Sequence, residues 1–313
     1  MRMNNMTKNY LVMALLLTGL LSTSTGSAQC QSERVKLQML GTRGPELWDG
    51  QASTGYLLWL DDRARVVIDA GPGTVQNFER SGARYQDLDL FLFSHFHIDH
   101  SADFPAYVKG GFFTDRKRDL VLIGPSGNEY LPSADQFLLR FFGKDTGVYP
   151  YMSSFIDPDA GSSYKILPKT VASSYKLLDE HEVYAHRDIR VKAVSVHHAV
   201  LPALGYRVEL AGCVISFTGD MSGRFHTMPD LARGSDILVA HNAIPEDETV
   251  AGQLLHMKPS YIGKLAADAG AKKLLLTHLM KRSAGRKEEN LELIRKHYKG
   301  EILFPRDLDV FRP

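Results

Sequence analysis

Short apolar runs separated by glycine-rich turns recur along most of this chain, and they limit the folds open to it. The runs have the length and residue types of β-strands: VKLQML, TGYLLWL, ARVVIDAG, DLFLFSH, DLVLIGPSG, VKAVSV, GYRVEL, CVISFTGD, DILVAH, KKLLLTH and EILF. Segments with helical spacing lie between some of them: TVQNFERSG, SADQFLLRFFG, PSYIGKLAADAG and RKEENLELIRKHY. Strands interleaved with helices in this way predict an α/β fold in which helices cover a sandwich of sheets.

The composition is that of an ordinary globular protein. The 313 residues are 44% hydrophobic and 23% charged, which is enough chain for one large domain or two modest ones. The 37 Lys and Arg residues nearly balance the 36 Asp and Glu residues, giving a formal net charge of +1. No overall positive field would draw such a chain onto nucleic acid or an anionic membrane, so any partner must be recognised locally.

The first 28 residues differ in kind from the rest. A positively charged start precedes the apolar core YLVMALLLTGLL, and small polar residues follow it in STSTGSAQ. This pattern indicates a secretory signal peptide cleaved after Ala28, because the apolar core is short for an uncleaved membrane anchor. We therefore expect residues 1–28 to be a signal peptide and residues 29–313 to form a periplasmic or secreted domain with no membrane contact after cleavage.

Cysteine chemistry is not expected to carry the function. Cys30 and Cys213 are the only cysteines, so the chain can form at most one disulfide, and neither cysteine belongs to a CxxC pair. Cys213 lies in the apolar run CVISF and reads as a small buried hydrophobic residue, while Cys30 reads as part of a frayed terminus. Whether the two pair is left open.

Residues from about 145 to 186 interrupt the rhythm of strands and turns. The stretch GVYPYMSSFIDPDAGSSY is rich in Gly, Pro, Ser and aromatic residues, which predicts a long insertion loop. Its aromatic side chains would either wall a substrate cleft or hold the loop against the body of the protein.

The stretch FLFSHFHIDHSAD, residues 91–103, crowds metal-binding side chains at the end of an apolar strand. His95 and His97 are two residues apart and can turn to one side of an extended backbone, whereas Asp99 and His100 follow where the chain begins to coil. One metal could take the first pair, and a second metal the other pair. Because zinc takes about four ligands, the rest of the chain must supply more.

Three later apolar strands also end on residues of the metal-binding type. VKAVSVHH ends at His197 and His198, CVISFTGD ends at Asp220, and KKLLLTH ends at His278. Loops at strand ends are where binding and catalytic residues collect. The repetition of this arrangement is stronger evidence for a shared site than any single histidine.

These motifs resemble a known family. HFHIDH matches the HxHxDH signature of the metallo-β-lactamase fold, and HHAVLPALGYRV, FTGD, HNAI and HMKPSYIGKLAADAGAKKLLLTH are similar to the branch containing ribonuclease Z and zinc-dependent arylsulfatases and phosphodiesterases. The resemblance implies an αββα sandwich of two mixed sheets flanked by helices. By the same resemblance, the first metal would be held by His95, His97 and His198, and the second by Asp99, His100 and His278, with Asp220 bridging both.

The choice between His197 and His198 depends on strand alternation. In VKAVSVHH, His198 shares a face with Val194 and Val196, whereas His197 falls on the opposite face. Aligning the family motif on AVSV also favours His198, but aligning it on PALGYR would allow His197.

The implied chemistry is hydrolysis at two zinc ions per chain, although Mn or Fe would tolerate the same ligands. Two cations a few Å apart can hold a shared hydroxide, because coordination lowers the pKa of water to about 7. The expected substrate is a phosphodiester or a sulfate ester. Asp99 and His256 are the candidate catalytic residues, and His256 matches a histidine that the ribonuclease Z family is proposed to use as proton donor to the leaving group.

Two other functions remain open. A lactonase or β-lactamase would use the same metals, and a metal-binding protein of this fold could lack turnover. The ribonuclease Z resemblance is also incomplete, because Asn242 follows His241 where that family usually has Glu, and no basic, Gly/Pro-rich arm is evident. We therefore expect a small-molecule ester as the partner and no nucleic acid. A homodimer is an open alternative that the resemblance implies, because relatives often form dimers. Asp69, in VVIDAGPG, is expected to support the site or a turn without binding metal.

Overall fold

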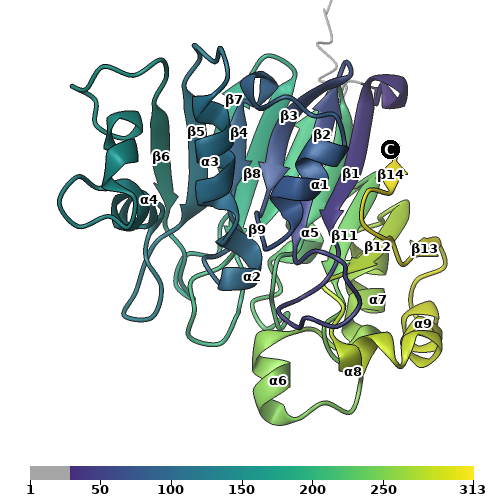
Figure 1. The fold of residues 1–313 in the computed structure, drawn as a ribbon. Coiled ribbons are helices and arrows are strands. Elements are labelled where there is room, and N and C mark those ends of the chain that lie inside the picture. Colours follow the sequence, from purple (N-terminus) through teal and green to yellow (C-terminus); the bar gives the residue numbers. More distant parts are fainter. Residues whose placement is uncertain (1–28) are drawn as a thin grey trace, which may run out of the picture.

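Two seven-stranded sheets form the centre of the computed structural model, which describes residues 29–313 (Figure 1). The predicted signal peptide, residues 1–28, lies outside the described residues. In spatial order, the strands of the first sheet are β14 (Val310–Phe311), β1 (Val35–Gly41), β2 (Gly55–Leu60), β3 (Arg63–Ile68), β4 (Leu90–Leu92), β5 (Leu120–Pro125) and β6 (Ile166–Val171). Those of the second are β13 (Glu301–Leu303), β12 (Lys273–Thr277), β11 (Ile237–His241), β10 (Cys213–Phe217), β9 (Leu204–Leu210), β8 (Ile189–Ser195) and β7 (His181–His186).

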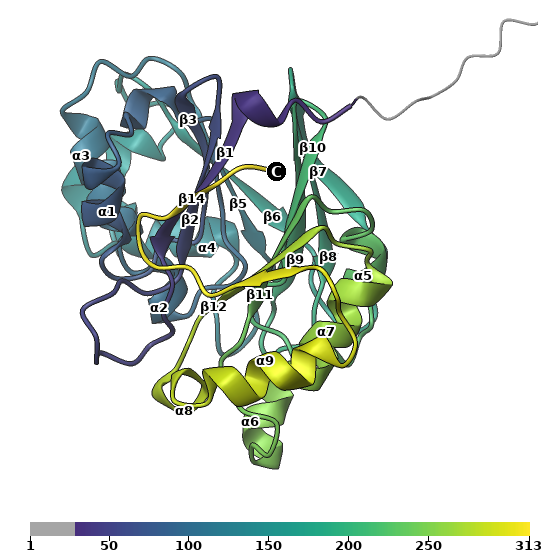
Figure 2. The ribbon, with the colours of Figure 1, turned by 90° about the vertical axis from the view of Figure 1, so that its right-hand side faces the viewer.

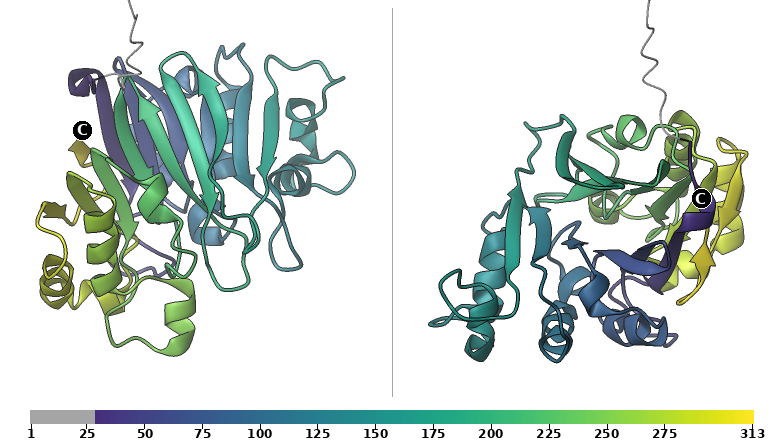
Figure 3. Two further views of the ribbon diagram at one scale, coloured as in Figure 1. Left: turned by 180° about the vertical axis from the view of Figure 1, so that it is seen from behind. Right: turned by 90° about the horizontal axis from the view of Figure 1, so that it is seen from above.

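Helices cover the outer face of each sheet (Figures 2 and 3). The helices on the side of the first sheet are α1 (Thr74–Arg80), α2 (Ile98–Ser101), α3 (Phe104–Phe112) and α4 (Ala134–Phe142). Those on the side of the second sheet are α5 (Met228–Leu231), α6 (Val250–Leu255), α7 (Pro259–Asp268), α8 (Lys281–Ala284) and α9 (Lys287–Arg295). Short 3₁₀ turns occur at η1 (Ser32–Arg34), η2 (Tyr85–Asp87) and η3 (Pro150–Phe155). Within residues 29–313, none of the helices combines the length and apolar character needed to cross a bilayer. The predicted αββα sandwich is confirmed.

Strand β4 shows why the sequence lacks polar alternation before the histidine motif. Leu90 and Leu92 point into the core between the two sheets, and Phe91 points into the core beneath the helices. The Phe91 ring meets the edges of Phe104 and Tyr107 at centroid distances of 5.2 Å. A strand buried on both faces must be apolar at every position. Because β4 packs into both cores, its position is fixed, and so is the position of the histidine motif that follows it.

The parallel parts of both sheets bring the ends of their strands to one edge. Strands β3, β4, β5 and β6 are parallel to one another, and so are β10, β11, β12 and β13. In Figure 1 the loops that follow these strands, together with α2, lie along the lower edge of the sandwich. Ligands commonly bind at the carboxyl ends of parallel strands, so this edge is where the predicted site should form.

The segment predicted as an insertion loop, residues 145–186, contains two strands in the structure. β6 pairs in parallel with β5, and β7 pairs antiparallel with β8, so each closes an edge of its sheet. Edge strands face solvent, and the middle residues of β6, Leu167–Thr170, are accordingly all exposed and do not alternate between apolar and polar, which hides the strand pattern. The aromatic part of the segment packs on the body: Met152 and Phe155 are buried, and the Tyr149 ring stacks on Phe141 of α4.

The two cysteines form a disulfide. Cys30 and Cys213 are bonded and connect the segment before η1 to the first residue of β10. The sequence interpretation of Cys30 as part of a frayed terminus is therefore wrong. Hydrophobic burial of Cys213 was inferred correctly, but burial alone does not reveal a partner 183 residues away in the chain.

Candidate metal centre

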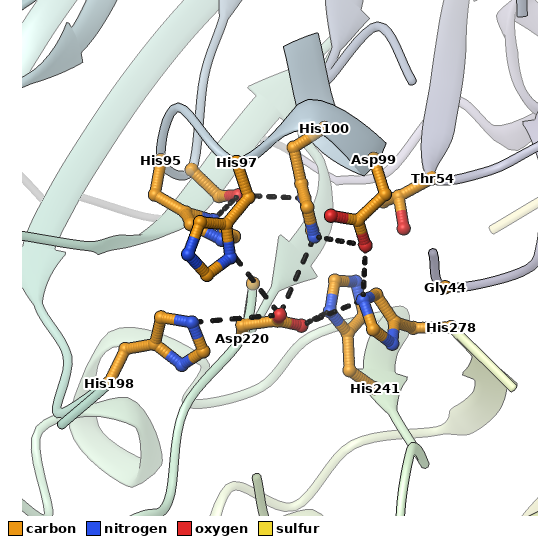
Figure 4. A network of polar contacts seen from close by, with 12 residues as sticks. Gly44, Thr54, His95, His97, Asp99, His100, His198, Asp220, His241 and His278 are labelled. Atoms are coloured by element: carbon orange, nitrogen blue, oxygen red, sulfur yellow. Dashed lines mark hydrogen bonds and ion pairs between the residues drawn. The ribbon is translucent and has the colours of Figure 1, made fainter. Parts of the chain in front are cut away.

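Each sequence-predicted ligand lies at the end of an element, and the fold brings them together (Figure 4). From the first sheet, His95 and His97 follow β4, and α2 carries Asp99 and His100. The second sheet supplies His198 after β8, Asp220 after β10 and His278 after β12. The site therefore forms only where the two sheets meet.

The first ligand group consists of His95, His97, His198 and Asp220. Each residue offers one ligand atom, and these atoms lie within 4.8 Å of one another. His95 Nε2 and His198 Nε2 are 3.9 and 3.8 Å from Asp220 Oδ2. All but His97 are buried, so the group has a single partly open side.

The second predicted group consists of Asp99, His100, His278 and Asp220. His278 Nε2 lies 3.1 Å from Asp99 Oδ2 and 3.3 Å from Asp220 Oδ1. His100 Nε2 lies 3.5 Å from Asp99 Oδ2 and 3.5 Å from Asp220 Oδ2. Tetrahedral zinc with bonds near 2.1 Å separates its ligand atoms by roughly 3.4 Å, and these four distances lie close to that value. The set whose ligand atoms all lie within 4.8 Å of one another is, however, His100, Asp220, His241 and His278, without the predicted Asp99.

The chemistry of the buried atoms also fits metal ions. His95 Nε2, His100 Nε2 and His198 Nε2 are buried and have no hydrogen-bond partner among residues 29–313. Burying a nitrogen without a hydrogen-bond partner costs free energy, and a bound metal ion would supply the missing partner. Burial lowers the pKa of His198 to about 4 and holds the pKa of His95 well below its usual range. Both rings are therefore neutral at pH 7, as metal binding requires.

Asp220 is the residue that both groups share. Burial alone would raise the pKa of its carboxyl, but the surrounding His278, His256 and His100 hold that pKa well below its usual range. His278 shows the reciprocal effect: burial lowers its pKa, and Asp220 and Asp99 more than offset this and raise it. Asp220 therefore stays ionised in the free protein, with an oxygen available to each group.

His241 holds Asp220 in place, a role that the sequence did not reveal. Its Nδ1 lies 2.7 Å from Asp220 Oδ1, and its Nε2 lies 2.9 Å from the hydroxyl of Tyr56, which also contacts Thr277 Oγ1 at 2.8 Å. His241 is close enough to His100 and His278 to be a possible ligand. Because both of its ring nitrogens already have partners, we assign it to positioning Asp220. The sequence feature that could have indicated this role is the position of His241 at the end of β11, beside the other strand ends.

Asp69 supports His100, in line with the role expected from the sequence. Its Oδ2 lies 2.8 Å from His100 Nδ1 and accepts a 2.7 Å bond from Ser94 Oγ, while its Oδ1 accepts a 2.8 Å bond from Ser94 N. A carboxylate on the far nitrogen fixes the tautomer of a metal-binding histidine so that Nε2 faces the ion. Asp69 and His278 both have positive φ angles, of 56° and 54°, a strained backbone that proteins tend to keep at functional sites.

The structure separates the two candidate histidines after β8. His198 is 1% exposed, faces the cluster, and contacts the carbonyl oxygen of Leu255 through Nδ1 at 2.8 Å. His197 is partly exposed, and its Nδ1 lies 2.6 Å from Ser222 Oγ, away from the first group. The geometry therefore favours His198 as the ligand, as strand alternation predicted.

His256 lies against the cluster without joining either ligand group. Its Nδ1 is 3.8 Å from Asp220 Oδ1 and has no hydrogen-bond partner within residues 29–313. Burial lowers the pKa of His256 to about 3, although Asp220 opposes the shift. Asn242 stands where the ribonuclease Z pattern has Glu, and its Oδ1 accepts a 3.2 Å bond from Asn290, so this side chain does not serve His256.

The chain is similar in sequence and fold to several known proteins. The model of the "Beta-lactamase superfamily domain" matches residues 152–279. The ribonuclease Z of Thermobifida fusca is 25% identical, over 87% of this chain and 93% of its own length. Among solved structures, human tRNase Z, short form, aligns with a TM-score of 0.68 and 18% identity over 88% of this chain and 98% of its own. A metallo-β-lactamase fold protein from Bacillus subtilis aligns with a TM-score of 0.65 and 19% identity, covering 89% and 99%.

The chain is a metal-dependent hydrolase of the metallo-β-lactamase fold. Its sequence is ribonuclease Z-like across most of its length.

The expectation of a small-molecule ester partner without nucleic acid is wrong for this hydrolase. The matched relatives are ribonucleases Z, and one matched structure is a tRNase Z, which points to nucleic acid. The expectation rested on the balanced net charge, on the missing basic arm and on the predicted export. The net charge and the missing arm do not exclude RNA, because phosphate contacts need only a few local cations and RNA is largely recognised through shape and single-stranded bases.

Replacing Asp220 tests the shared-ligand assignment. Because Asp220 contacts both groups, Asp220→Ala should lose more metal than His198→Ala, which removes a ligand from one group only. Elemental analysis of the purified variants measures this, with the exposed His181→Ala as a control that keeps wild-type metal content. Retention of two metals per chain in Asp220→Ala would refute the assignment.

Proposed function

We propose that this hydrolase is a phosphodiesterase that cleaves RNA at a centre of two zinc ions. The observation that carries the proposal is Asp220, whose carboxylate lies between the two ligand groups: its Oδ2 is 3.8 Å from His198 Nε2 and its Oδ1 is 3.3 Å from His278 Nε2. When bound there, the ions would lower the pKa of a water molecule and stabilise negative charge on the phosphate. The remaining tasks fall to side chains of the chain itself.

Asp99 is suited to accept a proton. Its Oδ2 faces His278 and His100, and its Oδ1 makes none of the hydrogen bonds found among residues 29–313. Burial alone would raise the pKa of Asp99, but His100 and His278 hold it below its usual range. The carboxylate is thus ionised at neutral pH. We assign Oδ1 as the atom that accepts a proton from the attacking water.

His256 is suited to return a proton to the leaving oxygen. It stands beside Asp220 and His278, with ring centroids of His256 and His278 5.4 Å apart. The ring is neutral in the free protein, and an anionic phosphate beside it would raise its pKa by favouring the charged form. A proton gained with the substrate can then pass to the departing alkoxide.

RNA as the substrate class is supported by relatives named ribonuclease Z that match nearly the whole chain. The matched Beta-lactamase superfamily domain, residues 152–279, contains four residues of the site, namely His198, Asp220, His256 and His278. Local positive charge is available beside the centre, because Arg224 is exposed and close enough to lower the pKa of His197, after the larger effect of burial.

A substrate panel tests the proposed chemistry. We expect zinc-loaded protein to cleave short single-stranded RNA and bis(4-nitrophenyl) phosphate, and Asp220→Ala to cleave neither, as followed by gel electrophoresis and nitrophenolate absorbance. Aryl sulfate, lactone and cephalosporin substrates serve as comparisons. Cleavage of these three but of neither phosphodiester would refute the phosphodiesterase, and cleavage of the aryl phosphodiester alone would remove RNA as the substrate.

The role of His256 should depend on the leaving group. His256→Ala should lower kcat on the order of a hundredfold or more for RNA, whose alkoxide leaving group needs a proton, and much less for bis(4-nitrophenyl) phosphate, whose nitrophenolate departs unaided. Metal content should not change. Equal losses on both substrates would assign His256 to positioning, and loss of metal would make it a ligand.

We further propose that the protein works in an oxidising compartment, the periplasm or the exterior. The Cys30–Cys213 disulfide supports this, since such bonds persist where thiols are not kept reduced. Mass spectrometry of protein from the native cells should give a chain beginning near Gln29 with no free thiol. An intact Met1 with two free thiols would overturn the proposal.

A further inference from the structure

A cleft of about 790 Å³ lies beside the metal centre on the side of His198. Loops from three strands border it: Ser126 follows β5, Ser174 and Tyr175 follow β6, and His197 follows β8. Phe225, from the loop after Asp220, completes the wall. The cleft thus borders both elements that carry the neighbouring ligands His198 and Asp220.

His197 and Phe225 form one wall of this cleft. Their ring centroids are 5.1 Å apart at an interplanar angle of 84°, an edge-to-face contact. His197 Nδ1 lies 2.6 Å from Ser222 Oγ, and Ser222 N donates a 2.7 Å bond to His197 O. These contacts join the loop after β8 to the loop after β10. His197, the alternative to His198 in the sequence, therefore lines the cleft.

The lining suits an uncharged, flat group. No carboxylate, ammonium or guanidinium is among the lining residues. Aromatic rings of Tyr175 and Phe225 supply flat apolar surfaces. Ser174 Oγ accepts a 3.2 Å bond from Lys176 N and keeps its own proton to donate. A phosphate would find no counter-charge here, whereas a base would find rings and a hydroxyl.

We propose that this cleft binds the base of the nucleotide next to the bond that is cleaved. The inference rests on the proposed function, and it adds that substrate is positioned through a splayed base as well as through its phosphate. A cavity of this size lies within the range of ligand pockets, and single-stranded bases bind proteins by stacking on aromatic side chains. Phe225 is the stacking residue, and His197 is a positioning residue that fixes its ring.

The experiment measures cleavage of short single-stranded RNA by zinc-loaded protein, with the base removed from the nucleotide on either side of the cleaved bond. Phe225→Ala should raise KM for intact RNA on the order of tenfold and leave kcat nearly unchanged. On RNA lacking the bound base, the same substitution should add nothing, because the interaction is already gone. Phe225→Trp should restore the wild-type KM.

Controls separate this role from a structural one. Phe113→Ala removes a phenylalanine that is 75% exposed and lies outside the cleft, and it should behave as wild type. Metal content of Phe225→Ala should match wild type. With 2-aminopurine at the position identified by base removal, binding should quench its fluorescence in the wild type and not in Phe225→Ala.

The possible failures are distinguishable. If wild-type protein neither binds nor cleaves RNA, both the proposed function and the base site are refuted. If it cleaves RNA but Phe225→Ala raises KM equally on intact and base-free RNA, only the base site is refuted, and Phe225 then shapes the loop. A loss of metal in Phe225→Ala would likewise refute the base site in favour of a structural role.

Discussion

The carboxylate of Asp220 is the group around which the site is built. It is 2% exposed, and a buried charge is stable only when it is paired and hydrogen-bonded. Its partners come from different parts of the fold, because His100 belongs to the first sheet's side and His241 and His278 to the second. The hydroxyl of Tyr56 in β2 reaches His241 and Thr277, so the same network joins the two sheets behind the centre. The site can therefore form only when the two sheets pack against each other.

The sequence predicts most of this arrangement because the relevant signals are local. The spacing of apolar residues and the turn residues between them identify the buried strands. In β4, for example, burial on both faces gives an uninterrupted apolar run. The ligand residues follow those strands directly, so their positions come with the strands. The choice of His198 over His197 rests on extending the alternation of Val194 and Val196 past the end of β8 at Ser195.

What the sequence does not reveal depends on distant parts of the chain. Strand β6 has exposed polar residues because it lies at a sheet edge, and no local pattern marks it. His241 resembles any histidine at a strand end until Tyr56 and Asp220 are placed beside it. Phe225 lies in a short loop whose contact with His197 exists only after β8 and β10 have been aligned through β9. The wrong prediction that nucleic acid is not a partner has a similar cause, because net charge averages over the whole surface and says little about one cleft.

The disulfide can form only late in the synthesis of the chain, because its two cysteines are 183 residues apart. Cys30 is made early, whereas Cys213 is the first residue of β10 and is made only after most of the first sheet and the strands β7 to β9 have been added. The covalent bond can therefore close only late, when β10 reaches its place in the second sheet. Since β10 leads directly to Asp220, oxidation of the two thiols and placement of the shared carboxylate depend on the same late strand. A ribosome-bound chain that stops short of β10 would carry an unpaired thiol together with an incomplete centre.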